Sequence, residues 1–169
     1  MPQARVAVVM GSDSDLPIVQ QAVDTLGKFG VEFDLRVLSA HRSPKLVAAF
    51  AEGAEARGVR VIIAAAGGAA HLAGVIAAHT TLPVIGIPID SSPLKGVDAL
   101  YATVQMPPGV PVATVGINAA ANAALLALQI LATSDEALRA RLAVYKADLA
   151  AQVERKSDAL REKLKEPPR

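Results

Sequence analysis

Residues 38–47 read LSAHRSPKLV and place His41 directly beside Arg42, which pairs a proton-transfer group with an anion-binding group. Histidine titrates near neutral pH and serves as a general acid or base, while a guanidinium holds a phosphate or carboxylate through two parallel hydrogen bonds. Ser39 adds a hydroxyl, and Pro44 suits the first turn of a helix. Such dipeptides are also common in solvated turns, so this stretch alone favours an ordinary turn in which Arg42 pairs with an acidic neighbour.

A second polar stretch, MGSDSDLP, places hydroxyls and carboxylates between an apolar run and a helix-compatible segment. Ser12 and Ser14 lie where backbone amides at a helix N-terminus attract anions. Asp13 and Asp15 would repel a phosphate, so Asp15 is suited either to gripping a sugar hydroxyl or to capping the helix. On this loop alone, capping is the favoured interpretation.

The third stretch, AAAGGAAHLAG, combines a diglycine with small residues and a histidine. Gly67 and Gly68 allow a ligand to lie directly against backbone amides, although close helix packing uses the same residue types. His71 is either a second site group or a polar residue in a first helical turn, and His79 is expected on the surface near a helix end. Three histidines without clustered carboxylates or cysteines predict no metal site.

Five apolar, β-branched runs separated by helix-compatible segments predict the strands that position these stretches. The predicted strands span 5–10, 31–38, 60–66, 83–89 and 111–117. Four runs are nearly continuously apolar, as in strands buried on both faces of a parallel sheet, whereas 31–38 alternates apolar and charged residues and is predicted to be an edge strand.

Alternating strands and helices predict a three-layer α/β/α fold, a doubly wound parallel sheet in the flavodoxin-like order 2-1-3-4-5. Ligands of such sheets bind beyond the carboxyl ends of the strands at the switch point, so the three polar stretches should meet in one crevice. The proline-rich segment 104–113 either walls that pocket or forms a rigid turn. We expect a single catalytic domain over residues 1–169.

The C-terminal forty residues predict a long helix over about 133–165. Its apolar positions 138, 142, 145, 149 and 153 form one stripe, and Thr133 and Glu136 have the spacing of a capping box. Packing on the chain's own domain and packing on a neighbouring subunit are equally consistent with this stripe. The last residues, KEPPR, are expected to be frayed.

Composition excludes several classes of protein. Seventeen basic and sixteen acidic residues leave a net charge of +1, and aromatic residues make up only 3%, so the chain lacks the basic patch and stacking platforms of a nucleic-acid binder. The N-terminal apolar run is too short for a signal peptide or a membrane span. With no cysteine, a cytoplasmic location is the default. A hydrophobic content of 52%, much of it alanine, indicates extensive subunit contacts.

Five motifs in order, MGSDSD, SAHRSP, AGGAAHLAG, SSPLKGVDAL and VQMPPGVPVATVGI, resemble the catalytic subunits of phosphoribosylaminoimidazole carboxylase, in their bacterial mutase class. The resemblance runs from about residue 5 to about residue 131. It implies a homo-octamer with active sites at subunit boundaries and an isomerase of de novo purine (IMP) biosynthesis. Its small-molecule ribonucleotide substrate, 5-(carboxyamino)imidazole ribonucleotide, would yield 5-amino-1-(5-phosphoribosyl)imidazole-4-carboxylate without ATP, metal or organic cofactor.

The resemblance also implies roles for individual residues. His41 would be the catalytic residue, protonating the leaving nitrogen and later accepting the ring proton. Arg42 would bind the phosphate and Asp15 the ribose hydroxyls, because a carboxylate beside a phosphate dianion costs energy that a guanidinium recovers. The substrate-binding residues would be Ser12, Ser14, Asp15, Ser39, Ala40, Arg42, Gly68, Ala69, His71 and Leu72.

Three alternatives remain at this point. A related carboxylase uses free carbon dioxide or bicarbonate with aminoimidazole ribonucleotide, although AGGAAHLAG favours the mutase. A signalling receiver needs a phosphoacceptor aspartate at the end of the third strand, where this chain has AAAGG. If the chain is a ligand-binding module without catalysis, binding is its only activity, and His41→Asn should leave that binding largely intact.

Overall fold

Five parallel strands form one sheet in the order β2-β1-β3-β4-β5, which confirms the predicted order. The computed structural model describes residues 4–165. The strands are β1 (Val6–Met10), β2 (Phe33–Val37), β3 (Val61–Gly67), β4 (Val84–Ile89) and β5 (Ala113–Thr114). The order places the switch point between β1 and β3, as expected.

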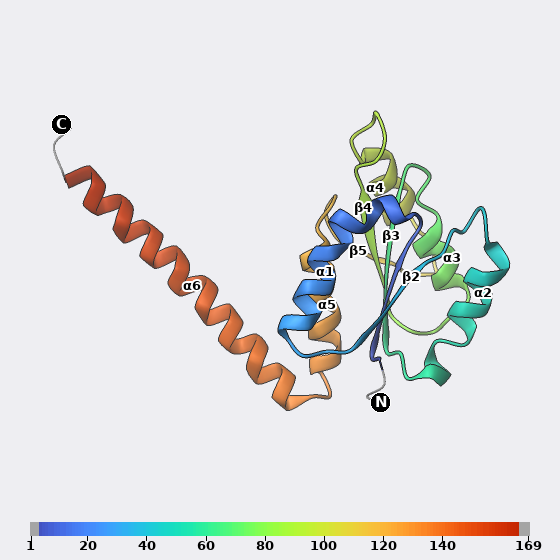
Figure 1. Cartoon of the computed structure of the whole chain (residues 1–169), viewed down its shortest axis with the longest axis horizontal. Coiled ribbons are helices and arrows are strands. Elements are labelled where there is room, and N and C mark those ends of the chain that lie inside the picture. Colours follow the sequence, from blue (N-terminus) through green and yellow to red (C-terminus); the bar gives the residue numbers. More distant parts are fainter. Residues whose placement is uncertain (1–3, 166–169) are drawn as a thin grey trace. The chain divides into compact units, whose positions relative to one another are not determined.

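Helices cover both faces of this sheet, so the predicted three-layer α/β/α architecture is confirmed. Figure 1 shows α1 and α5 on one face and α2 and α3 on the other. The helices are α1 (Leu16–Lys28), α2 (Pro44–Glu52), α3 (Leu72–Ala78), α4 (Val97–Val104), α5 (Ala120–Ala132) and α6 (Glu136–Lys165). Pro44 occupies the first turn of α2, as its fixed φ favours.

The strands differ in burial as their sequence patterns predict. All residues of β1 and β4 are buried, in keeping with their continuous apolar runs. Strand β2 lies at the sheet edge, and its Leu35 and Val37 are exposed by 37% and 51%. The edge-strand prediction for residues 31–38 is therefore confirmed.

Strand β5 is much shorter than predicted, because only Ala113 and Thr114 pair with β4. Pro111, at the start of the predicted run, has no N–H to donate to a ladder. After β5 the chain turns at Asn118, whose φ is 57°. The apolar run 111–117 thus contains a two-residue edge strand flanked by loop.

Buried residues from β1, β3, α2 and α3 form a core cluster between one sheet face and its helices. Gly86 in β4 lies at a tight point of this layer. A Cβ on Gly86 would overlap Thr103 Cγ2, and it would lie 3.0 Å from Val112 Cγ1 and 3.5 Å from Ala73 Cβ. Glycine at this position therefore allows the two helices that carry Thr103 and Ala73 to approach the sheet.

Gly86→Ala is expected to lower the free energy of unfolding by about 1–3 kcal/mol, because the added methyl overpacks this layer. Gly27→Ala is the matched control, since nothing lies within 4 Å of its Cβ position near the end of α1, and alanine is the better helix former. Urea denaturation of both variants measures the difference. Equal stability of the two variants would contradict the packing described for Gly86.

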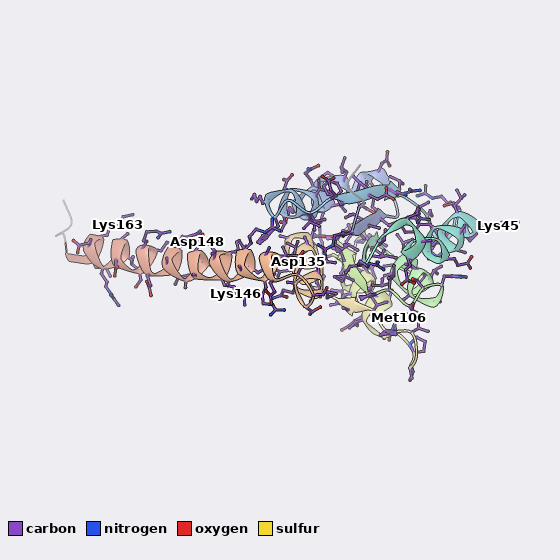
Figure 2. The ribbon with its side chains drawn as sticks, turned by 90° about the horizontal axis from the view of Figure 1, so that it is seen from below. Lys45, Met106, Asp135, Lys146, Asp148 and Lys163 are labelled. Carbon is purple, nitrogen blue, oxygen red and sulfur yellow. The ribbon has the colours of Figure 1, made fainter. Side chains whose placement is uncertain are left out.

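The chain divides into two compact units, residues 1–131 and 132–169. The second unit contains α6, which begins at Glu136, three residues after the predicted start. Asp135 caps it, because Leu138 N donates a hydrogen bond to Asp135 Oδ1 at 3.0 Å. Figure 2 shows charged side chains along this helix, Lys146, Asp148 and Lys163 among them.

Two predictions about the chain's organisation stay predictions. The single catalytic domain over 1–169 is one of them, and the frayed end is the other, because residues 166–169 lie outside the described residues. Among residues 4–165, no helix is long and apolar enough to cross a bilayer.

Candidate active site

One cavity of about 490 Å³ opens at the carboxyl ends of β1, β2, β3 and β4. This is the edge at which doubly wound sheets bind ligands. The structure brings the three polar stretches together there, as predicted. The predicted site residues that line the cavity are Ser12, Ser14, Asp15, Ser39, Ala40, His41, Arg42, Ala69, His71 and Leu72.

Gly68 is the predicted site residue that does not line the cavity. Its φ of 58° lets the chain turn as it leaves β3, so its part in the site is to shape the loop. Sequence reasoning assigned no site role to Gly11, Ala66 and Ser91, which do line the cavity. Gly67, which it did consider as a place for a ligand to lie against backbone amides, lines the cavity as well. Ser91 follows β4, and the strand-order rule that selected the other three loops applies to this one as well.

The first loop is held by its own hydroxyls. Ser14 Oγ donates to Ser12 Oγ at 2.8 Å, and Ser12 Oγ accepts from Ser14 N at 3.3 Å, capping a single 3-10 turn, η1 (Asp13–Asp15). Asp15 precedes α1 but makes no capping hydrogen bond with its side chain. The capping interpretation of Asp15 is therefore wrong, and its carboxylate is left facing the cavity.

Burial sets the protonation behaviour of Asp15, which is only 5% exposed. Removal from water raises the pKa of its carboxyl, and the charge of Asp13 raises it further, while hydrogen bonds from Ser12 and Ser14 oppose the rise. A raised pKa in the folded state means that ionised Asp15 costs folding free energy. This cost is absent below the carboxyl's ordinary pKa of 3.8 and is complete above the raised value.

Asp15→Asn is therefore expected to be more stable than the unaltered chain at neutral pH, with the advantage vanishing as the pH falls below 3.8. Thermal melts across this pH range measure the difference. Asp148→Asn, which alters an exposed carboxylate in α6, is the control and should show no comparable trend. An Asp15→Asn advantage that grows toward acid pH would contradict the assigned direction.

In the second loop, Ser39 and Ser43 fix the chain that carries His41 and Arg42. Ser43 Oγ donates to Ser39 O at 3.0 Å, and Ser39 Oγ accepts from Arg42 N at 3.2 Å. The guanidinium of Arg42 reaches across to the first loop, where its terminal nitrogen donates to Gly11 O at 3.1 Å. Arg42 has no carboxylate partner among residues 4–165, so the interpretation that paired it with an acidic neighbour in a turn is wrong.

His41 and His71 meet across the cavity, although they are thirty residues apart in the chain. The distance from His41 Nε2 to His71 Nδ1 is 2.8 Å, and the rings are nearly perpendicular at 74°. One nitrogen must donate and the other accept, so the pair shares one proton between them. The third histidine, His79, ends α3 outside this cavity and lies 3.1 Å from Glu52, as expected for a surface residue.

The proline-rich segment does not line the cavity within the chain. Its Met106 instead packs on α3, because a Cβ on Gly74 would lie 2.8 Å from Met106 Sδ. Figure 2 marks Met106 in the loop that follows α4. Within residues 4–165 no group of three or more histidine, aspartate or glutamate side chains is placed to hold a metal ion.

This arrangement separates two kinds of chemistry in one cavity. Arg42 offers a permanent cation that suits a phosphate or carboxylate, and the His41–His71 pair offers a ring N–H that can donate a proton and a ring nitrogen that can accept one. Asp15 offers a buried acceptor for hydroxyl groups. The site therefore suits a hydroxylated, anionic small molecule on which a proton must be moved.

Comparisons with known proteins agree on one family. The family model described as AIR carboxylase matches residues 5–152. The N5-carboxyaminoimidazole ribonucleotide mutase of Pyrococcus abyssi is 53% identical over 145 residues, covering 86% of this chain and 83% of that protein. Its namesake from Thermotoga maritima is 48% identical over 156 residues, covering 92% and 91%. The crystal structure of Treponema denticola PurE superposes with a TM-score of 0.80 at 28% identity, covering 92% of this chain and 97% of that one.

Proposed function

The chain belongs to the AIR carboxylase family, and on that premise we propose that it is an N5-carboxyaminoimidazole ribonucleotide mutase, an isomerase of purine biosynthesis. The similarity to proteins named as this mutase carries the proposal. The cavity agrees with it, because a ribonucleotide is an anionic, hydroxylated molecule and the reaction requires one proton to be moved. The carboxyl group passes from the exocyclic nitrogen of the imidazole to the ring carbon.

In the proposed binding mode Arg42 holds the phosphate of the substrate. The guanidinium already bonds to Gly11 O, so it is oriented before the ligand arrives. Asp15 accepts hydrogen bonds from the ribose hydroxyls. Its negative charge repels the phosphate, which therefore binds elsewhere in the cavity. Ser12, Ser14 and Ser39 contribute neutral donors, and Ala69 and Leu72 border the base.

His41 is the proposed acid and base. As an imidazolium it gives its proton to the exocyclic nitrogen while the bond from nitrogen to the carboxyl carbon breaks, which leaves aminoimidazole ribonucleotide and carbon dioxide. The ring carbon then forms a bond to carbon dioxide, and neutral His41 removes the ring proton to restore aromaticity. The imidazolium is regenerated, so atoms and charge balance over the cycle.

His71 supports this exchange in the proposal. Its Nδ1 lies 2.8 Å from His41 Nε2, so neutral His71 accepts a hydrogen bond from the imidazolium of His41 and orients it. This contact also occupies one nitrogen of His41 in the free chain. Either the other ring nitrogen of His41, Nδ1, presents the proton to the substrate, or the ring rotates away from His71 so that Nε2 presents it.

Supplying the carbamate substrate in buffer stripped of bicarbonate tests the function. A mutase transfers its own carboxyl group and continues to turn over, whereas a carboxylase that uses free carbon dioxide stops. We expect turnover to persist, with the carboxylate product measured directly. Turnover that depends on added bicarbonate would instead assign the chain to the carboxylase alternative, and binding of the ribonucleotide without conversion would indicate a non-catalytic module.

A homo-octamer with sites at subunit boundaries is part of the proposal. Supporting it, α4 exposes Val97, Tyr101 and Val104 along one face, and Leu94 is 64% exposed just before that helix. Water contact with so many large apolar groups is unfavourable, and contiguous patches of this kind mark subunit contacts. Sedimentation equilibrium measures the mass, and a stable monomer at micromolar concentration would refute the assembly.

A cytoplasmic location completes the proposal. It is supported by the absence of cysteine from the sequence, which gives no sign of an oxidising compartment.

A further inference from the structure

Ser91 carries a hydroxyl that the cavity presents to its ligand. It follows β4, is exposed, and lines the same cavity as His41 and His71. The hydroxyls of Ser12 and Ser14 bond to each other, whereas no hydrogen bond within residues 4–165 involves Ser91. Its Oγ can therefore donate and accept without breaking an existing contact.

The residues on either side of Ser91 are anchored. Asp90 N donates to Asn118 Oδ1 at 2.9 Å, and Ser92 Oγ donates to Asp98 Oδ2 at 2.8 Å. Asn118 is itself tied to the sheet, because its N–H donates to Pro88 O at 2.9 Å. Ser91 thus sits between two fixed neighbours, which is how a scaffold orients a binding group in advance.

Gly67 provides the space that the Ser91 side chain occupies. A Cβ on Gly67 would overlap Ser91 Oγ and would lie 2.9 Å from Ser91 Cβ. Gly67 is the last residue of β3 and pairs with Ile89, the last residue of β4. The hydroxyl therefore lies against the β3 end of the cavity, at the opening of the loop that carries His71.

Strand order then indicates which part of the substrate reaches Ser91. Arg42 follows β2, at one edge of the sheet, and it contacts the loop after β1. Ser91 follows β4, two strands beyond β1. A ribonucleotide whose phosphate is held by Arg42 extends its imidazole away from that edge, toward β3 and β4.

We infer that Ser91 Oγ donates a hydrogen bond to the migrating carboxyl group. This inference rests on the proposed function. The group is an anion in the carbamate and neutral when released as carbon dioxide, so a cation there would favour the ground state and raise the barrier to release. A neutral hydroxyl binds an oxygen of either form and keeps carbon dioxide close to the ring carbon.

Ser91→Ala in the full chain tests the role, with Ser157→Ala in α6 as a matched loss of an exposed hydroxyl. For Ser91→Ala we expect kcat/KM for the carbamate substrate to fall by about 10- to 100-fold, as for loss of a hydrogen bond to a charged group. The Kd for aminoimidazole ribonucleotide, which lacks the carboxyl group, should stay within about twofold of the unaltered value. Ser157→Ala should match the unaltered chain in both measurements.

Escape of carbon dioxide provides a readout that a structural role would not change. Ser91→Ala should release a larger fraction of each turnover as aminoimidazole ribonucleotide. Unchanged kcat/KM, or an equal loss of affinity for aminoimidazole ribonucleotide, would overturn the inference. If the unaltered chain does not convert the carbamate, the proposed function fails, and ligand binding by Ser91→Ala then decides the role of Ser91. Weaker binding of the 4-carboxylate ribonucleotide, with unchanged binding of aminoimidazole ribonucleotide, supports the inference. Any other pattern overturns the inference.

Discussion

The His41→Asn variant is expected to lose about 10²- to 10⁴-fold in turnover while it still binds the ribonucleotide. That range is the usual contribution of a positioned general acid or base. In the proposed reaction His41 supplies a proton in one step and removes a proton in the next. Asparagine has no group that titrates near neutral pH, but it retains polar atoms for the contact with His71. Steady-state turnover and the Kd for aminoimidazole ribonucleotide, measured on the same preparation, separate the two effects.

His79→Asn is the matched control, because His79 lies outside the cavity and pairs with Glu52. Its turnover should equal that of the unaltered chain. A His41→Asn variant with near-normal turnover would remove His41 from the proposed role. Loss of ribonucleotide affinity in parallel with turnover would instead make His41 a binding residue.

The second large effect is expected at Arg42. Arg42→Met should raise the Kd for the ribonucleotide by about 10- to 100-fold, because hydrogen bonds to a charged group contribute about 1.5–3 kcal/mol. The corresponding nucleoside, which lacks the phosphate, should bind the variant and the unaltered chain equally. Arg42→Lys should restore part of the affinity, since it keeps the charge but loses the two-pronged geometry.

Arg36→Met is the matched control for this change. Arg36 lies in neighbouring β2, pairs with Asp34 at 2.8 Å and is not part of the cavity. Its affinity for the ribonucleotide should be unaltered. Should Arg42→Met weaken nucleoside and nucleotide by the same factor, the guanidinium contacts the sugar or base and another group binds the phosphate.

Much of the fold was predictable because parallel sheets leave a strong pattern in sequence. Continuous apolar runs mark strands buried on both faces, and the alternation in 31–38 marked the edge strand β2. Boundaries were less predictable. Only two residues of the apolar run 111–117 pair with β4 to form β5. Helix α6 begins at Glu136, after the Asp135 cap. The ends of strands and helices depend on pairing and capping partners that the local sequence pattern does not reveal.

Local patterns also misjudged two side chains. Asp15 has the residue type and position of a helix cap, yet it makes no capping bond and is buried at the cavity. Ser91 lies in SSPLKGVDAL, one of the motifs that carry the family resemblance, but no role was assigned to its hydroxyl. Its Oγ enters the cavity because Gly67, on the neighbouring strand, has no side chain.

The sequence by itself determined which chemical groups stand at the carboxyl ends of the strands: the guanidinium of Arg42, the imidazole of His41, and hydroxyls beside them. These assignments need only residue type and position in the strand–helix alternation, which are local properties. Only the tertiary structure decided that His41 meets His71 at 2.8 Å, that Asp15 is withdrawn from water, and that Ser91 rests on Gly67. Each depends on residues distant in the chain that strand register and helix packing bring together, and no local pattern encodes those distances.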